Sequence, residues 1–270
     1  MLTVTTLASG SGGNSLLVSG GGTHILIDAG ISCLRITKSL SALGIDPHDL
    51  SAVLVTHDHS DHVCGLATVF KRLPNLQAFA SVGTAQRLNR RAELACGRVE
   101  PIPAGSTFDL GALRCRSFST PHDAADSVGY TVELDGERMA LVTDLGHVTD
   151  TVRHAVLGCR LLVLETNHDI PTLRSGPYPY PLKQRILGDR GHLCNEAGAQ
   201  LALEAVHAGA HTLLLAHLSQ ENNTPSMAYT CVCRTLSAAG IDPRQDVTVC
   251  VAPRSEPGQT YPVSKERSLC

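Results

Sequence analysis

Three histidines and two aspartates lie within six consecutive residues, in the segment His57-Asp58-His59-Ser60-Asp61-His62. Neutral imidazole and ionised carboxylate groups are the ligands that divalent metals such as Zn²⁺, Fe²⁺ and Mn²⁺ accept. The apolar residues Leu54 and Val55 come shortly before the segment, so the ligands stand where a strand gives way to a loop. The alternative is a solvated, histidine-rich turn, but this order of ligands behind a hydrophobic strand favours a metal site.

The spacing of these residues predicts two neighbouring metal positions. Residues two apart in an extended segment point to the same side, so His57 and His59 can bind one metal together while Asp58 points away. After a turn, the adjacent pair Asp61 and His62 can reach a second metal, at the roughly 3.5–4 Å separation of two-metal hydrolases.

The elements that position this segment alternate along the chain. Apolar runs between glycine turns predict strands over 2–7, 15–18, 24–28, 52–56, 77–80, 98–102, 113–119, 127–134, 137–143, 161–164, 212–216 and 246–251. Helices are expected over 33–43, 63–73, 84–94, 148–156, 195–208 and 225–239. Asp135-Gly136 predicts a tight hairpin turn. Strands cluster before helices twice, which favours two sheets packed face to face with helices outside.

The length and composition fit one large core. The 270 residues are 43% hydrophobic, enough for one compact domain or two closely packed halves. No linker rich in proline and glycine interrupts the middle, so we expect a single domain over 1–252 and a loosely ordered C-terminal tail over 253–270. The net charge of −3 gives no overall attraction to nucleic acid, although bound metals can supply positive charge locally.

Two further features bear on the compartment. The segment Met1–Leu7 lacks the basic flank and cleavage site of a secretory signal, and no apolar run approaches the ~20 residues that span a bilayer. The 10 cysteines are scattered without a C-x-x-C pair, so we interpret most as reduced, buried small hydrophobes, with Cys64 and Cys194 as the ones adjoining motif residues. We therefore expect a cytoplasmic protein.

The pattern His57-x-His59-x-Asp61-His62 resembles the signature of the metallo-β-lactamase-like hydrolase superfamily. This resemblance implies an α/β fold, a four-layer αβ/βα sandwich of two mixed sheets with helices outside. Later motifs follow in the superfamily's order, each a polar residue after an apolar strand. They are Asp28, His122, Asp144 and His217.

The resemblance also implies roles for these residues and a cofactor of two divalent metal ions (Zn, Mn or Fe). The first metal would take His57, His59 and His122, and the second Asp61, His62 and His217. Asp144 would bridge both metals, and Asp28 would hold the ligand loop without binding metal. A water shared between two bridged cations loses a proton near neutral pH and becomes a hydroxide nucleophile.

Two motifs in the C-terminal half resemble ribonuclease Z. They are Glu165-Thr166-Asn167-His168 at the end of an apolar strand and Gly191-His192 before a helix. By this resemblance Asp61, Glu165 and His192 are the catalytic residues, with His192 as general acid to the leaving oxygen and Glu165 as its partner. The alternative for His192 is a purely structural place ahead of the helix that begins near Asn195.

The chain most resembles the bacterial YycJ/WalJ branch of the superfamily, from Leu2 to about Val251. The shared marks are Leu7–Ser15, Pro121–Ala124, Glu165–Asp169 and Ala216–Pro225, and the departures are Pro171-Thr172-Leu173 and Cys194. That resemblance implies a DNA exonuclease acting 5′ to 3′. No β-CASP insertion is present. A small-molecule hydrolase of the same fold, such as a thioesterase, lactonase or cyclic phosphodiesterase, is the alternative, and a non-catalytic metal- or nucleic-acid-binding module is a third.

Other residues suit a nucleic-acid substrate, DNA before RNA, with no membrane partner. Tyr178, Lys183 and Arg185 can stack on a base and contact phosphate, and Asn222 lies in a shared motif; a solvated loop explains them equally well. Arg87, Arg90 and Arg91 fit a solvated helix face, and the Ser9–Gly13 loop fits a hairpin turn or a phosphate loop. His168 fits a residue that supports a metal ligand, one that faces the substrate, or a purely structural histidine. The sequence leaves the oligomeric state open, a homodimer included.

Overall fold

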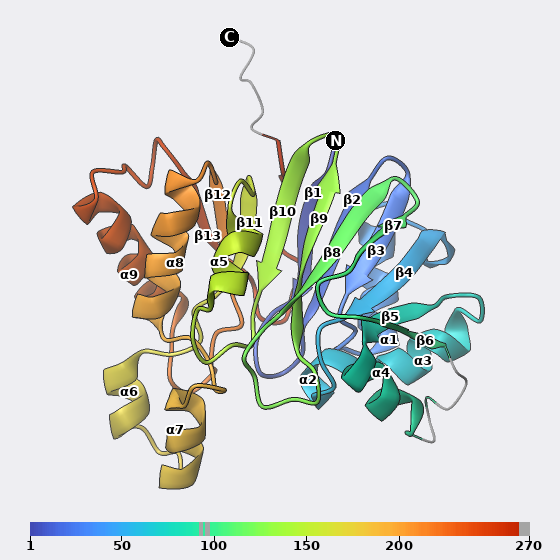
Figure 1. The fold of residues 1–270 in the computed structure, drawn as a ribbon, viewed down its shortest axis with the longest axis horizontal. Helices are drawn as coiled ribbons and strands as arrows, with labels where there is room; N and C mark the ends of the chain where they lie inside the picture. Colours follow the sequence, from blue (N-terminus) through green and yellow to red (C-terminus); the bar gives the residue numbers. More distant parts are fainter. Residues whose placement is uncertain (92–93, 95–97, 265–270) are drawn as a thin grey trace.

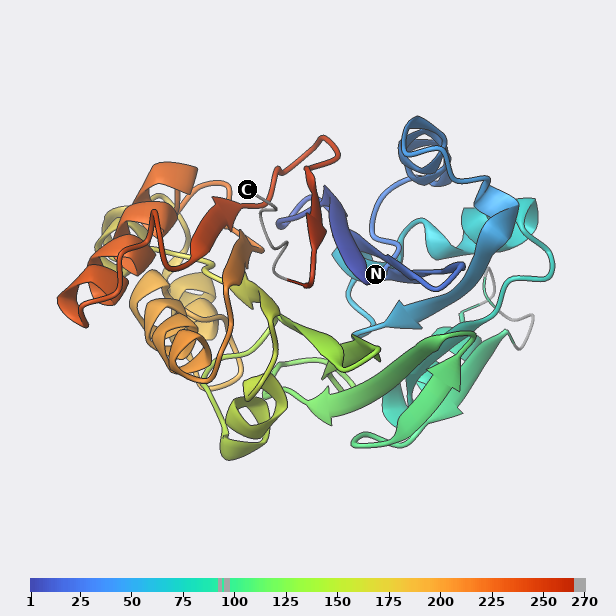
Figure 2. The same ribbon diagram turned by 90° about the horizontal axis from the view of Figure 1, so that it is seen from above.

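Two seven-stranded sheets pack face to face and carry helices on their outer faces (Figures 1 and 2). The structure, a computed structural model, describes residues 1–91, 94 and 98–264. The four layers confirm the sandwich predicted from the sequence.

The first sheet has the strand order β14-β1-β2-β3-β4-β5-β6. Its strands β14, β1, β2 and β3 pair antiparallel, and β3 to β6 pair parallel, so the sheet is mixed. The bounds are β1 Thr3–Ala8, β2 Ser15–Gly20, β3 Thr23–Ile27, β4 Leu50–Val55, β5 Ala78–Ser81, β6 Val99–Ile102 and β14 Thr260–Pro262.

The second sheet has the order β13-β12-β11-β10-β9-β8-β7. Strands β7 to β10 form an antiparallel meander, and β10 to β13 pair parallel. The bounds are β7 Thr107–Leu110, β8 Leu113–Ser119, β9 Val128–Leu134, β10 Glu137–Val142, β11 Leu161–Glu165, β12 Thr212–Ala216 and β13 Thr248–Val251. Asp135 and Gly136 both have positive φ, 53° and 80°, which is the geometry of the predicted hairpin turn.

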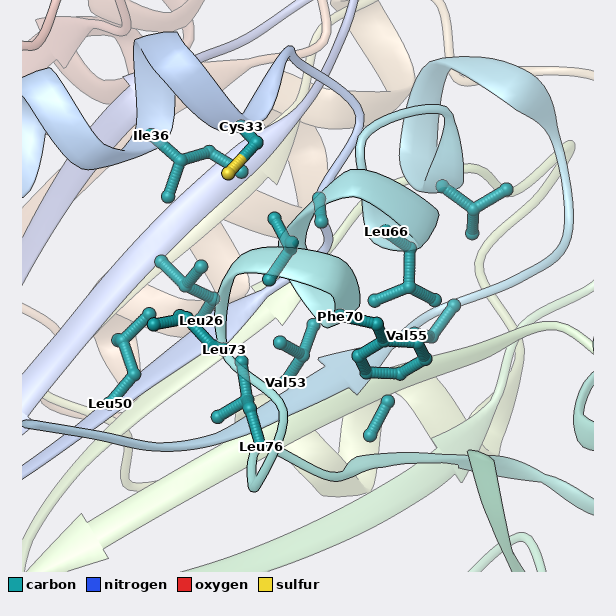
Figure 3. Close-up of a cluster of buried hydrophobic side chains, with 14 of the residues drawn as sticks. Leu26, Cys33, Ile36, Leu50, Val53, Val55, Leu66, Phe70, Leu73 and Leu76 are labelled. Atoms are coloured by element: carbon teal, nitrogen blue, oxygen red, sulfur yellow. The ribbon is translucent and has the colours of Figure 1, made fainter. Parts of the chain in front are cut away.

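The helices lie outside the two sheets. Their bounds are α1 Cys33–Ala42, η1 Pro47–Asp49, α2 Ser60–Val63, α3 Leu66–Arg72, α4 Val82–Asn89, α5 Asp150–Val156, α6 Ile170–Ser175, α7 Tyr180–Leu187, α8 Asn195–His207 and α9 Pro225–Ala238. On the first sheet, Ile36 of α1 and Phe70 of α3 pack over Val53 and Val55 of β4 (Figure 3). On the second sheet, α5, α8 and α9 bury a corresponding cluster that includes Leu162, Leu201 and Val232.

A third apolar cluster fills the space between the sheets. Ile25 and Leu54 of the first sheet and Tyr130 and Leu161 of the second all belong to it, and each is fully buried. The hydroxyl of Tyr130 donates to the backbone oxygen of Val55 at 2.9 Å, so its one polar atom is satisfied across the interface. The close packing of these side chains fixes the two sheets relative to each other. It therefore also fixes the positions of the strand ends of one sheet relative to those of the other.

Several segments differ from the sequence expectation. The helix expected over 63–73 begins earlier and is divided into α2 and α3, and α6, α7, β7 and β14 were not expected. The tail expected from residue 253 instead supplies β14, which pairs with β1, and Val263 is fully buried. Residues 92–93 of the helix expected over 84–94, and 265–270 of the tail, lie outside the described residues. Among the described helices none has both the length and the apolar character to cross a membrane.

Candidate metal centre and active site

The polar residues expected at strand ends meet at one end of the sandwich, where α2 lies (Figure 1). The first sheet supplies the residues that follow β4, and the second supplies the residues that follow β8, β10 and β12. They are His57, His59, Asp61 and His62 from the first sheet, and His122, Asp144 and His217 from the second. The centre therefore forms only where the two sheets meet.

His57, His59 and His122 form a first cluster. Nε2 of His122 lies 3.3 Å from Nδ1 of His59, and the ring of His57 lies 4.6 Å from that of His59 and 5.0 Å from that of His122, centroid to centroid. One ring nitrogen from each residue lies within 4.8 Å of the others. Three imidazole nitrogens at this spacing suit a single ion such as Zn²⁺.

Asp61, His62 and His217 form a second cluster beside the first. Oδ2 of Asp61 lies 3.5 Å from Nε2 of His62 and 3.6 Å from Nε2 of His217. Asp144 stands between the clusters, because its carboxylate lies 3.5 Å from both His62 and His217 and 3.8 Å from Nε2 of His122. A carboxylate in this place can face two ions at once.

In His62 and His122, a neighbouring group accepts a hydrogen bond from Nδ1, so that Nε2 faces the centre. Nδ1 of His62 donates to Oδ2 of Asp28 at 2.7 Å, and Thr56 donates to the same carboxylate through its N–H and its hydroxyl, both at 2.8 Å. Nδ1 of His122 donates to the backbone oxygen of Gly191 at 3.0 Å. Such outer contacts fix the tautomer and the orientation of a ligand.

The centre passes a test of fit for divalent ions. Nε2 of His57, Oδ2 of Asp144 and Nε2 of His217 are buried, and none has a hydrogen-bond partner among the described residues. Buried polar atoms are nearly always satisfied, so these three atoms, each of which belongs to a group able to hold an ion, fit a centre that binds metal. The donor set of imidazoles and carboxylates is that of Zn²⁺, Mn²⁺ or Fe²⁺.

The electrostatics of the centre favour the metal-binding form of His57 and of both carboxylates, but not of His62 and His217. Although burial opposes it, Asp144 raises the pKa of His62 well above its usual value and that of His217 to about 10, so these two rings must release a proton to bind metal. Burial, and then the neighbouring His62, lower the pKa of His57 well below its usual value, which keeps that ring neutral. Burial opposes ionisation of Asp144, yet His217 and His62 hold its pKa well below the usual value. Burial likewise opposes ionisation of Asp61, but the rings of His217 and His62, 3.6 and 3.5 Å from its Oδ2, lower its pKa. Both carboxylates are therefore ionised at neutral pH.

His192 and Glu165 stand together at the side of this centre. Nδ1 of His192 lies 2.9 Å from Oε1 of Glu165 and 3.7 Å from Asp144, and the ring stacks on that of His217 at 5.3 Å. Glu165 also accepts from the N–H of Leu193 at 3.0 Å. Although burial opposes ionisation, His192 and His217 hold the pKa of Glu165 at about 2. Nε2 of His192 is left as the ring nitrogen available to a substrate.

The first loop of the chain holds the second cluster, a role the sequence did not reveal. Nδ2 of Asn14 donates to Oδ2 of Asp61 at 3.3 Å and lies 3.1 Å from Nε2 of His62. Oγ of Ser9 accepts from the N–H of His217 at 2.8 Å, and Nδ2 of Asn167 donates to the oxygen of His217 at 2.9 Å. A serine and an asparagine in a glycine turn carry no local signal for this contact.

Strained backbone marks three of the predicted positions. Four described residues other than glycine have positive φ. One is Asp135 of the hairpin turn, and the others are Asp28, Asp144 and His217, at 65°, 60° and 57°. Such residues persist only where the surroundings over-determine them, and they gather at functional sites. Gly30 is needed beside them because a Cβ there would lie 1.7 Å from the backbone oxygen of Asp61.

Two residues expected to bind substrate have structural contacts instead. Nζ of Lys183 donates to the backbone oxygens of Arg174 and Gly176, both at 2.7 Å, so it caps the end of α6. Asn222 is fully buried and its amide donates to Oγ of Ser219 at 3.3 Å, which removes it from any substrate surface. These corrections follow from burial and pairing that the sequence pattern did not show.

Arg185 of α7 lies beside the first cluster, to which Asp123 connects it. Its guanidinium donates to both oxygens of Asp123, at 2.5 and 3.1 Å, and Oδ1 of Asp123 lies 3.5 Å from Nε2 of His122. Half of the Arg185 side chain remains exposed. Of the two tyrosines that precede Arg185 in the sequence, Tyr178 is half-buried and Tyr180 is 72% exposed.

His168 and the cysteines that the structure describes belong to none of the groups able to hold a metal ion. The side chain of His168 is buried, and its two ring nitrogens have no hydrogen-bond partner within the described part of the chain. Sγ of Cys194 accepts from the N–H of Ala197 and caps α8, and Sγ of Cys64 donates to the backbone oxygen of Gly30. The described cysteines are free thiols.

Comparison with known proteins agrees with this site. Residues 23–218 match the β-lactamase superfamily domain. Over 240 residues the chain is 36% identical to the exodeoxyribonuclease WalJ of Streptococcus pneumoniae, covering 87% of this chain and 88% of that protein. Over 235 residues it is 34% identical to the exodeoxyribonuclease YycJ of Bacillus anthracis, covering 87% and 89%.

The fold has a counterpart among solved structures. The metallo-β-lactamase fold protein YhfI of Bacillus subtilis superposes with a TM-score of 0.70 at 16% identity, covering 97% of this chain and 100% of that one. The match of the domain, the two relatives and the His/Asp clusters together make the chain an enzyme of the hydrolase type. It belongs to the metallo-β-lactamase superfamily and, within it, to the family that includes WalJ and YycJ.

Proposed function

We propose that this protein is a DNA exonuclease that hydrolyses phosphodiester bonds from a 5′ end with two divalent ions. His57, His59 and His122 would hold the first ion, and Asp61, His62 and His217 the second, with Asp144 between them. The orphaned atoms of His57, Asp144 and His217 support this assignment. The two similar proteins named exodeoxyribonucleases support DNA as the substrate.

The observation that carries the proposal is the pair of His192 and Glu165. When bound, the ions supply Lewis acidity and lower the pKa of water, which serves many kinds of hydrolysis. Phosphodiester cleavage needs, in addition, a proton for the departing alkoxide. Glu165 fixes Nδ1 of His192 at 2.9 Å, so that Nε2 can donate a proton to that oxygen.

Asp28 and Asn14 act on this centre from outside it. Asp28 holds His62 through Nδ1, and Asn14 holds Asp61, so both orient the second cluster without occupying it. Arg185 would bind a phosphate of the substrate, because it is the half-exposed cation that Asp123 connects to the first cluster. Tyr180, exposed on the same helix, offers a stacking surface for a base.

A cleavage assay tests the proposal. The metal-loaded protein should release nucleotides from DNA labelled at either end, and the order in which label appears reports the polarity. Matched RNA, a thioester and a lactone serve as competing substrates, with metal content measured on the same preparation. Cleavage of a thioester or lactone with intact DNA would overturn the proposal in favour of a small-molecule hydrolase.

A further inference from the structure

Asp58 lies between two residues of the first cluster but points away from it. The side chain is 3% exposed. Its Oδ2 accepts from Nε of Arg87 at 2.9 Å, its Oδ1 accepts from the N–H of Ala125 at 3.1 Å, and its backbone oxygen accepts from Arg91 at 2.6 Å. The two arginines therefore contact a buried residue, while the side chain of Arg87 stays on a solvated face, as expected, at 64% exposed.

These contacts join two loops that come from different sheets. Asp58 stands in the loop after β4, between His57 and His59. Ala125 stands in the loop from β8 to β9, three residues after His122. One carboxylate thus connects both loops that supply the first cluster.

Helix α4 ties the same two loops from outside. Its residue Arg87 binds Asp58, while near its start the N–H of Gly83 donates to Oδ2 of Asp126 at 3.1 Å and Oγ1 of Thr84 donates to the backbone oxygen of Asp126 at 3.0 Å. Asp126 directly follows Ala125 in the second loop. The helix, Asp58 and the loop of His122 therefore form one cross-linked unit behind the cluster.

We propose that Asp58 is a positioning residue that sets the metal affinity of the first cluster by holding His57 and His59 in register with His122. A buried carboxylate is costly unless it is paired, and here Arg87 and Ala125 pair it. Groups that orient ligands without touching the ion change metal affinity by about 10- to 100-fold when removed. The proposal rests on the two-ion centre described above.

The second cluster should be insensitive to this residue. Asp61 is held by Asn14 and His62 by Asp28, and these contacts lie on the side of the first loop and β3. Substitution of Asp58 should therefore lower the affinity for the ion of the first cluster and leave the affinity for the other ion unchanged. That asymmetry separates a positioning role from a general loss of folding.

The test measures metal binding by the full chain after its metal has been removed. Zn²⁺ affinity is obtained by competition with a chromophoric chelator, and Co²⁺ titration follows the d–d absorption of each site. Asp58→Ala removes both contacts of the carboxylate, and Asp58→Asn keeps an acceptor for Ala125 but loses the ion pair. Arg87→Ala removes the ion pair from the other side, on a side chain that is 64% exposed. Asp150→Asn, on a side chain that is 90% exposed, is the control for charge.

We expect Asp58→Ala to weaken one site by about 10- to 100-fold and leave the other unchanged. Asp58→Asn and Arg87→Ala should show a smaller and similar loss, and Asp150→Asn none. Unchanged binding in folded Asp58→Ala, or an equal loss at both sites, would overturn the proposal. If Asp58→Ala does not fold, wild-type affinity in both Asp58→Asn and Arg87→Ala would do the same. A wild-type protein that binds fewer than two ions contradicts the two-ion function instead.

Discussion

Glu165 accepts a hydrogen bond from Nδ1 of His217 at 2.9 Å, through the same oxygen, Oε1, that contacts His192. One buried carboxylate therefore orients both the proposed general acid and a proposed metal ligand. A substitution of Glu165 should therefore affect both proton donation by His192 and metal binding by His217. A substitution of His192 should affect proton donation alone.

Replacing His192 should separate chemistry from metal binding. We expect His192→Ala to lower kcat by about 10²- to 10⁴-fold, because the leaving oxygen loses its proton donor. Metal content should stay at the wild-type level, since the histidine is not in either cluster. Steady-state cleavage of DNA and metal analysis of one preparation measure both; a variant that has lost metal would make His192 a ligand.

Replacing Glu165 should impair both functions. In Glu165→Gln the neutral amide no longer attracts the N–H groups of His192 and His217 as a carboxylate does. We expect the same kind of fall in kcat as for His192→Ala, together with metal affinity weakened by about 10- to 100-fold. Isothermal titration with Zn²⁺ provides the second readout. Normal affinity would show that His217 is held without Glu165.

Arg185 should act on substrate binding and leave the chemical step alone. We expect Arg185→Ala to raise KM for DNA by about tenfold with little change in kcat, because a charged hydrogen bond to phosphate contributes about 1.5–3 kcal/mol and this side chain is half-exposed. The salt dependence of binding should fall by about one phosphate contact. Lys183→Gln is the matched control, since Lys183 caps α6. Equal salt dependence in wild type and Arg185→Ala would exclude the contact.

His168 should make the protein sensitive to acid. Burial lowers its pKa to about 4, whereas an unfolded histidine titrates near 6.5. As pH falls from about 6.5 to about 4, protons bind the unfolded chain first, so the stability that the neutral ring contributes is present above 6.5 and is lost below it, by up to about 3 kcal/mol. In His168→Leu this part of the acid sensitivity should vanish.

Urea denaturation at pH 7.5 and pH 4.5, with chelator present, measures the effect. At pH 7.5 the substitution should change stability little, because the ring nitrogens of His168 have no hydrogen-bond partner among the described residues. A pH dependence identical to that of the wild type would mean that folding does not shift the pKa of His168, and would contradict the prediction.

The parts of the centre with local signals were predictable from the sequence. Asp28, Asp144 and His217 each come after a run of apolar residues, and parallel or adjacent strands bring such residues to one edge. The spacing of His57 and His59 placed their rings together and turned Asp58 away. The geometry of His57, Asp58 and His59 follows from the period of a strand, which a single sequence displays, whereas the choice of Asp28, Asp144 and His217 was implied by the resemblance to the superfamily's motifs.

The contacts that hold the centre depend on residues far apart in the chain, and the sequence did not show them. Asn14 lies 47 residues from Asp61, and Ser9 lies 208 residues from His217. Lys183 was expected at the substrate because it belongs to a stretch of aromatic and cationic residues ahead of His192, but its Nζ caps α6. β14 pairs with β1, which lies near the other end of the chain. Its three residues are too few to show a strand pattern in the sequence, and the pairing that makes them a strand is not local.

The position of the centre on the seam between the sheets has a thermodynamic consequence. A divalent ion bound there contacts both halves, so it can bind only the docked state, and its binding free energy adds to the cohesion of the sandwich. At a free-ion concentration 100 times the dissociation constant, that linkage contributes about 2.7 kcal/mol. An ion bound at this seam would therefore raise the free energy of unfolding of the whole sandwich, in proportion to the logarithm of the free metal concentration above the dissociation constant.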